Sequence, residues 1–136
     1  MPLDASPDPI HVVGAAILRP MICLVTRRAA HVRSPGRWEF PGGKVEPGET
    51  PRAALERELQ EELAIDVQAG DFLGRGVAEQ PERTLVLDIY CCRWLGGQLS
   101  LSDHDAVRWI QASQIDDLLW AEADVPVLPA LRHVLA

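Results

Sequence analysis

The sequence contains few cysteines, little positive charge and no long apolar run. Its three cysteines, Cys23, Cys91 and Cys92, are odd in number and lack the spacing of a zinc-binding motif, so neither a disulfide framework nor a local zinc site is expected. No apolar segment approaches the roughly 20 residues of a membrane-spanning helix, and no basic and then apolar leader opens the chain. We therefore expect a cytoplasmic protein with no membrane partner.

Positive charge is scarce relative to negative charge. Thirteen Lys and Arg residues stand against 20 Asp and Glu residues, which gives a net charge of −7 at pH 7. Because nucleic-acid-binding proteins usually carry a basic patch, this balance argues against a nucleic acid as a partner. A small anionic substrate would fit such a chain only together with a cation.

The length and the hydrophobic content suit one folded domain. A chain of 136 residues, 47% of them hydrophobic, can bury a sizeable core. Residues 1–9 are rich in proline and acidic side chains and predict a flexible lead, so the domain is expected over residues 10–136. Nothing in the pattern marks a large apolar interface, and we expect a monomer or a weak dimer.

Several segments have the pattern of strands. Near-continuous apolar runs at residues 10–18 and 22–26 predict two strands of a sheet that is covered on both faces. Residues 84–94 alternate and predict another strand, in which Asp88 is either paired within the sheet or a polar group at a ligand pocket. Near the C-terminus, Ser113 is expected to open a helix.

A further helix is predicted from residue 51 onward. Thr50 is a good N-cap, and Pro51 suits the first helical position because its missing N–H costs nothing there. From this start, Leu55, Leu59 and Leu63 recur at helical spacing and form an apolar stripe for the core.

Glu58, Glu61 and Glu62 fall on one edge of this helix, beside the apolar stripe. Like charges at such spacing oppose an isolated helix by roughly 0.2–0.5 kcal/mol per pair, whereas a bound divalent cation would reverse the sign. Oxygen ligands without His or Cys nearby favour a hard ion, so Mg²⁺, with Mn²⁺ as a substitute, is the expected cofactor. The alternative is a solvated acidic helix face.

The spacing of residues 43–65 resembles the Nudix box, the signature of hydrolases that act on a nucleoside diphosphate linked to another group. The matching residues are Gly43, Glu49, Arg57, Glu58, Leu59, Glu61, Glu62 and Ile65. One position departs from the family pattern, because Ala64 stands where the family has glycine. A left-handed conformation at this alanine would cost roughly 1–2 kcal/mol.

The resemblance implies a fold and a set of roles. The fold is the Nudix α/β/α sandwich, an α/β (α+β) architecture in which a mixed sheet lies between helices. The metal ligands that it implies are Gly43, through its carbonyl, and the carboxylates of Glu58, Glu61 and Glu62. Glu49 and Arg57 are expected to pair and to hold the loop against the helix, which is a structural role.

Two residues upstream of the box are candidates for substrate binding. Arg28 belongs to the run from Thr26 to Ala30, which looks like MutT-like members of the family, where the second Arg of the pair touches the nucleotide. A guanidinium group also matches phosphate oxygens. The alternative is a solvated basic loop. Trp38 is a candidate for stacking on a base.

An acidic loop precedes the strand expected around Trp109. In the family a segment at this place supplies a further carboxylate for the metal or the water; Asp103 fits it best and Asp105 second, with a plain turn as the alternative. The group that takes the proton of the attacking water is expected to be Glu58 or Glu61 on the helix, or Asp103.

Asp124 precedes an amphipathic helix predicted over residues 127–135. An N-cap role explains an aspartate at such a place. The resemblance adds a second role, because an Asn or Asp here in MutT-like enzymes reads the edge of the base.

Together these features predict a Mg²⁺-dependent enzyme that hydrolyses a nucleoside triphosphate to the monophosphate and pyrophosphate. The MutT-like layout implies sanitation of the nucleotide pool with 8-oxo-dGTP as a substrate, whereas Asp124 is more like relatives that favour CTP or dCTP. The alternatives are hydrolysis of ADP-ribose, dinucleoside polyphosphates or RNA 5′ ends, and a non-catalytic nucleotide sensor on the same fold.

Overall fold

The computed structural model describes residues 8–136. The flexible lead expected over residues 1–9 therefore lies almost entirely outside the described residues. Within them the elements are, in chain order, β1 (Ile10–Arg19), β2 (Ile22–Arg28), β3 (Trp38–Glu39), β4 (Gly42–Lys44), α1 (Pro51–Leu63), β5 (Ile65–Glu79), β6 (Thr84–Gly97), β7 (His104–Ile110), the 3₁₀ helices η1 (Ala112–Asp117) and η2 (Glu122–Val127), and α2 (Leu128–Leu135). None of these helices is long and apolar enough to cross a membrane.

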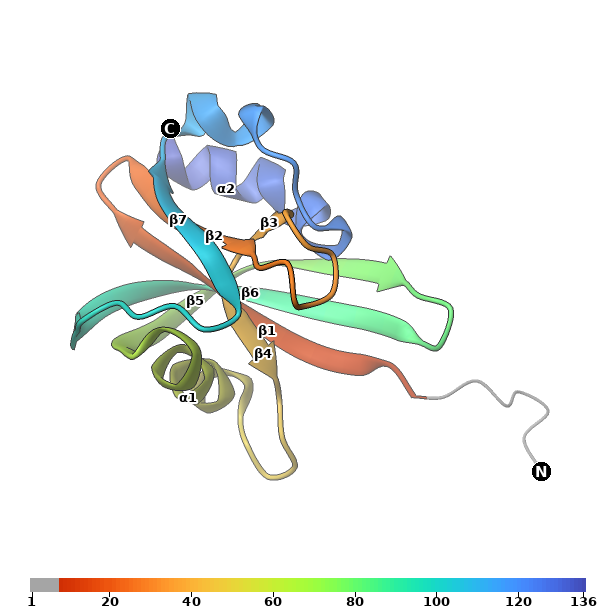
Figure 1. Cartoon of the computed structure of the whole chain (residues 1–136). Helices are drawn as coiled ribbons and strands as arrows, with labels where there is room; N and C mark the ends of the chain where they lie inside the picture. The colour runs from red at the N-terminus through yellow and green to blue at the C-terminus, as the bar shows by residue number, and fades with distance from the viewer. Residues whose placement is uncertain (1–7) are drawn as a thin grey trace, which may run out of the picture.

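A mixed sheet organises the described part of the chain. Its strands lie in the order β3-β2-β1-β6-β5, while β4 pairs with β1 and β7 pairs with β2. Strands β1 and β6 are parallel, and the other pairs are antiparallel. Helix α1 covers one face, and η1, η2 and α2 lie against the other (Figure 1). This arrangement confirms the predicted sandwich of helices around a mixed sheet.

Strand β1 is apolar on both sides because each face of the sheet has its own core. Val13 and Ile17 pack with Leu55 and Leu59 of helix α1. Ala16 lies in the second core, on the face that the C-terminal helices cover. The near-continuous hydrophobic run of this strand follows from its position between two helical layers.

Helix α1 begins and ends where local chemistry dictates. The Thr50 hydroxyl accepts a hydrogen bond from the Ala53 N–H at 3.1 Å, and Pro51 is the first helical residue, as predicted. The helix ends at Leu63. Ala64 then adopts a left-handed conformation with φ 60° and ψ 32°, which costs an alanine roughly 1–2 kcal/mol.

The helix expected from Ser113 is instead the short 3₁₀ helix η1, which starts at Ala112. The Gln111 N–H donates to the side-chain oxygen of Gln114 at 2.8 Å. A helix is present as expected, but the capping residue was wrong, because Gln111 precedes the helix and its contact with Gln114 satisfies the end that Ser113 was expected to cap. The closing helix α2 matches its predicted range to within one residue.

Candidate active site

Strand β4 and the loop after it bring the backbone of Gly43 against helix α1. In the sheet Gly43 pairs with Val13 of β1. A Cβ atom built on Gly43 would overlap the carboxylate of Glu58. A side chain at residue 43 would therefore displace the Glu58 carboxylate, whereas glycine leaves it in place beside the main chain of β4.

Arg57 holds the loop and the helix together in what we name the Arg57 cluster (Arg57, Glu49, Glu58 and Glu61). Arg57 Nε and Nη2 donate to the two oxygens of Glu49 at 2.7 and 2.8 Å, so the predicted pair is present. Nη1 donates to Glu58 Oε1 at 2.9 Å and to Glu61 Oε2 at 3.1 Å. The hydrogen bonds from Arg57 lower the pKa of Glu49 to about 2.

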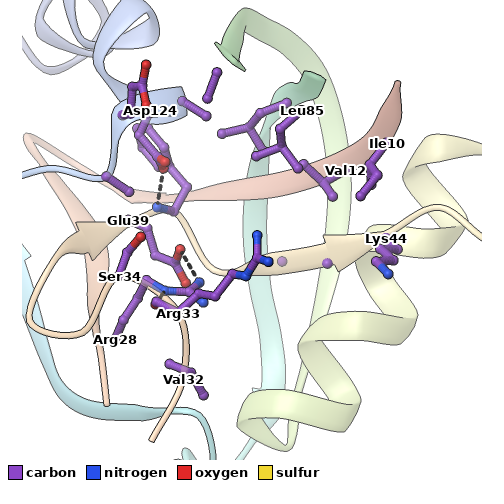
Figure 2. A pocket seen from close by; sticks show the side chains of 18 of the residues that line it. Ile10, Val12, Arg28, Val32, Arg33, Ser34, Glu39, Lys44, Leu85 and Asp124 are labelled. Carbon is purple, nitrogen blue, oxygen red and sulfur yellow. Dashed lines mark hydrogen bonds and ion pairs between the residues drawn. The ribbon is translucent and has the colours of Figure 1, made fainter. Parts of the chain in front are cut away.

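A cavity of about 540 Å³ lies beside this cluster. Figure 2 shows Lys44 and Asp124 on opposite sides of it in the view. Apolar side chains of the sheet form one part of the wall, and charged side chains form another: Arg28, Arg33, Lys44, Arg83, Glu39, Glu62, Glu82, Asp103, Glu122 and Asp124. Apolar surface with a few convergent polar groups is typical of a small-molecule site.

Among the box carboxylates, Glu62 belongs to the cavity wall, whereas Glu61 turns outward to Arg57 with 58% of its side chain exposed. Burial raises the pKa of Glu62 to about 8, reinforced by the negative charges of Glu58, Glu39 and Asp103. Burial also raises the pKa of Glu58. Positive charge beside Glu58 and Glu62 would therefore stabilise this edge of α1.

The possible metal ligands on α1 suit a hard cation but are not grouped around one point. All of them are oxygens, which Mg²⁺ and Mn²⁺ prefer. Over residues 8–136, however, no group of three or more His, Cys, Asp or Glu side chains is placed to hold a metal ion. A cation beside Glu58 and Glu62 would have to complete its shell with water or substrate oxygens, as Mg²⁺ usually does.

A second charged group, which we name the Glu39 cluster (Glu39, Arg28 and His104), lies in the cavity wall. Arg28 Nη1 is 2.9 Å from Glu39 Oε1 (Figure 2), and His104 Nε2 is 2.9 Å from Glu39 Oε2. Arg28 Nε also donates to the main-chain oxygen of Arg33. The structure thus places the predicted residue Arg28 at the cavity, held by two partners.

Asp124 does not cap a helix. It lies inside η2 and is 3% exposed, and its Oδ2 accepts a hydrogen bond from the Phe40 N–H at 2.9 Å. The N-cap interpretation is wrong, because the packing of η2 against the β3–β4 connection aims the carboxylate at that strand end. Burial, together with the negative charge of Glu39, raises the pKa of Asp124 well above its usual value.

Of the two candidate aspartates, Asp103 just before strand β7 and Asp105 within it, the structure brings Asp103 to the cavity and keeps Asp105 away from it. Asp103 lies 3.5 Å from His31 through Oδ1 and Nε2, with 52% of its side chain exposed. Asp105 instead pairs with Arg27 at 2.7 Å. Geometry therefore favours Asp103.

Trp38 is buried in the core on the face covered by the C-terminal helices and is not among the residues that line the cavity. Its main chain bonds to Leu119 and Ala121 at 2.9 Å each, which turns this part of β3 toward the helical layer. The candidate stacking role of Trp38 is not supported by this position.

Asp88 is paired within the sheet and does not line the cavity. Arg75 Nε lies 2.7 Å from its Oδ1, and His11 Nε2 lies 2.8 Å from its Oδ2. These partners hold the pKa of Asp88 below its usual value. Of the two alternatives left by the sequence, pairing within the sheet is confirmed.

Sequence reasoning missed Glu39 and His104. Their contact joins residues 65 positions apart, so no local spacing marks it. The available signal was Glu39 itself, a charged residue between two aromatic residues in a short strand, which needs a partner if it is buried.

A family model described as the NUDIX domain matches residues 9–131. The chain belongs to the Nudix domain family. Nudix enzymes act on small nucleotide substrates and generally use divalent metal ions. The cavity beside the Nudix box is thus the candidate active site of a Nudix hydrolase.

Named relatives and a solved structure extend this assignment. CTP pyrophosphohydrolase of Escherichia coli (strain K12) is 37% identical over 127 residues, which cover 93% of this chain and 94% of the relative. The 8-oxo-dGTP diphosphatase of the same strain is 44% identical over 110 residues, covering 81% and 85%. The solution structure of the E. coli ORF135 protein is similar with a TM-score of 0.84 and 35% identity, covering 100% of this chain and 96% of that one.

Proposed function

We propose that this Nudix hydrolase cleaves a nucleoside triphosphate to the monophosphate and pyrophosphate with the help of Mg²⁺. We further propose a substrate of the CTP/dCTP or 8-oxo-dGTP type and a role in nucleotide-pool sanitation. The observation that carries the proposal is the cavity, because the box carboxylate Glu62 and the buried Asp124 lie in the wall of one space, which has both apolar and charged side chains. The named activities of the two E. coli relatives support the same substrate class.

The end of the cavity near α1 suits the polyphosphate. Gly43, Glu58, Glu61 and Glu62 are the residues that would hold the metal, which when bound neutralises phosphate charge and makes a water more acidic. Arg28, Arg33, Lys44 and Arg83 add positive charge in the cavity wall for the phosphate oxygens.

A carboxylate of this chain would accept the proton of the attacking water. Arg57 donates to both Glu58 and Glu61. Asp103 is half exposed in the cavity wall and lies 3.5 Å from His31. Asp103 is therefore the more available acceptor, with Glu58 and Glu61 as the other candidates.

The opposite end suits a base. Asp124 uses Oδ2 for the Phe40 N–H, and among the described residues no hydrogen bond is formed by its Oδ1. When Asp124 is protonated, Oδ1 can donate to a ring nitrogen or carbonyl of a base, and when ionised it can accept from an amino group. Both forms can read a base edge, so Asp124 is compatible with cytosine and with oxidised guanine.

Pyrophosphate release with Mg²⁺ tests the proposal. The panel contains CTP, dCTP, 5-methyl-dCTP, dGTP, 8-oxo-dGTP and ADP-ribose, and rates are compared as kcat/KM. We expect a nucleoside triphosphate to be the best substrate and Glu58→Gln to lose about a thousandfold in kcat/KM.

Glu56→Gln is the matched control on the same helix. Glu56 accepts from the Ala69 N–H at 2.9 Å and is neither one of the proposed metal ligands nor part of the cavity wall, so its amide variant should keep wild-type activity. The proposal fails if no triphosphate is hydrolysed, if ADP-ribose is preferred, or if Glu58→Gln matches Glu56→Gln. Nucleotide binding without turnover would favour the sensor alternative.

A further inference from the structure

His104 is a buried histidine in the cavity wall. Only 2% of its side chain is exposed, and in the sheet register it lies opposite Arg28 of β2. Nε2 lies 2.9 Å from Glu39 Oε2. Nδ1 is buried without a hydrogen-bond partner among the described residues. Among the described residues, the imidazole therefore makes its polar contact with Glu39.

That contact completes the hydrogen bonding of Glu39. Its carboxylate is an acceptor, so the Nε2 of His104 must carry the hydrogen and donate it. The other oxygen, Oε1, takes its hydrogen bond from Arg28 Nη1 at 2.9 Å. Each oxygen of Glu39 thus accepts from one side-chain donor, and together the two donors hold the orientation of this carboxylate. The Glu39 side chain is 15% exposed.

Arg28 depends on this arrangement for its own position. Its guanidinium reaches the cavity wall with 26% of the side chain exposed. Its partners are the Glu39 carboxylate and the Arg33 main-chain oxygen. A long side chain with this freedom keeps one orientation only while its partners stay in place.

We propose that His104 is a positioning residue that holds Glu39, and through Glu39 the guanidinium of Arg28, in the orientation in which Arg28 meets the substrate. The inference rests on the proposed function, in which Arg28 binds the nucleotide. Without the Nε2 donor, Glu39 Oε2 is left in the cavity wall without a partner. Glu39 then turns toward another donor and moves Arg28 with it.

Steady-state kinetics with the best nucleotide of the panel test this role. His104→Leu should raise KM about tenfold while kcat changes by less than about threefold, because binding and not chemistry is disturbed. His104→Gln, whose side-chain amide also carries an N–H donor, should restore most of the loss. In a Glu39→Gln background, His104→Leu should change KM by less than about twofold, since the two act through one contact.

His11→Leu is the matched control. It removes a histidine contact of the same kind, Nε2 to the Asp88 carboxylate at 2.8 Å, outside the cavity wall. It should lower the melting temperature and leave KM unchanged. The proposal is overturned if His104→Leu only lowers the melting temperature, if His104→Gln fails to rescue KM, or if the effects of His104→Leu and Glu39→Gln on KM are additive.

A spectroscopic readout separates this inference from the proposed function. Nitrogen-15 NMR of the imidazole should show hydrogen on Nε2 of His104, and Glu39→Gln should shift that signal while leaving the His11 signal in place. If no nucleotide is hydrolysed, the proposed function fails, and this measurement still decides whether His104 holds Glu39. An Nε2 signal that is unchanged by Glu39→Gln would refute the inference.

Discussion

The two charged clusters beside the cavity are built in opposite ways. The Arg57 cluster joins one loop to the helix that follows it, and Glu61 in it is more than half exposed. The Glu39 cluster joins residues of β2, β3 and β7, and its contacts span 11 and 65 positions of the chain. The contacts of the first lie within the loop and α1. The second exists only when three strands are in register.

This difference assigns the clusters different tasks. Arg57 divides its donors among three carboxylates and the Lys44 main-chain oxygen, so it orients the groups proposed to hold the metal. The Glu39 cluster lies in the cavity wall and holds one cation, Arg28, there. We therefore expect damage to the Arg57 cluster to lower kcat and damage to the Glu39 cluster to raise KM.

The largest expected effect is that of Arg57→Ala. Glu49, Glu58 and Glu61 all lose a donor, and the carboxylates proposed to hold the metal lose their orientation. We expect kcat to fall about a hundredfold, the upper range for groups that orient metal ligands. Arg52→Ala is the control, because Arg52 lies on the same helix and donates to the Gly70 main-chain oxygen. Equal effects of the two substitutions would remove the distinction between the clusters.

Metal addition should stabilise the folded chain through the edge of α1. Mg²⁺ or Mn²⁺ at about a hundredfold excess over its Kd should add about 2.7 kcal/mol to the free energy of unfolding. Scanning calorimetry with and without chelator measures the shift in melting temperature. Glu62→Gln should reduce that shift and Glu56→Gln should not. A chain that melts at the same temperature with and without metal would contradict the proposed site.

The pH dependence of the stability of Asp124→Asn tests the buried side of the cavity. The pKa of Asp124 is raised in the folded chain. The protonated carboxyl therefore contributes its full stabilisation below the unfolded pKa of about 3.9, and the free energy of unfolding falls as pH rises toward the folded pKa. Asparagine cannot ionise and still accepts from the Phe40 N–H. The variant should match wild type near pH 4 and become more stable than it as pH rises to 8. Urea unfolding measures this, and a difference independent of pH would exclude a buried ionisable Asp124.

The smallest expected effect concerns the end of α1, outside both clusters. Ala64→Gly should raise the free energy of unfolding by about 1 kcal/mol, because glycine adopts the left-handed conformation without strain. Ala53→Gly, an exposed position inside the same helix, should lower it by a similar amount, about 1 kcal/mol. Denaturant unfolding measures both changes, provided that the dependence of the free energy of unfolding on denaturant concentration keeps the same slope. A loss of stability in Ala64→Gly would mean that the alanine is not strained.

The part of the site that sequence reasoning found is the part whose contacts join residues close together in the chain. Thr50, Pro51 and the leucine stripe locate α1, and the helical period then fixes which face Glu58 and Glu62 share. The pairing of Glu49 with Arg57 lies within the same segment and is present in the structure. Periodicity did not reveal that Glu61 turns to Arg57 and that Glu62 lines the cavity, because side-chain partners decide that orientation.

The sequence by itself determined α1, the apolar strands and the carboxylates of the Nudix box, because helix and strand periods place neighbouring residues without reference to the rest of the chain. The tertiary structure alone decided that Asp124 meets Phe40 instead of capping a helix, and that Trp38 belongs to the core. It also decided that Arg28, Glu39 and His104 share one wall of the cavity. These contacts depend on strand register and on packing between layers, which a short stretch of sequence does not encode.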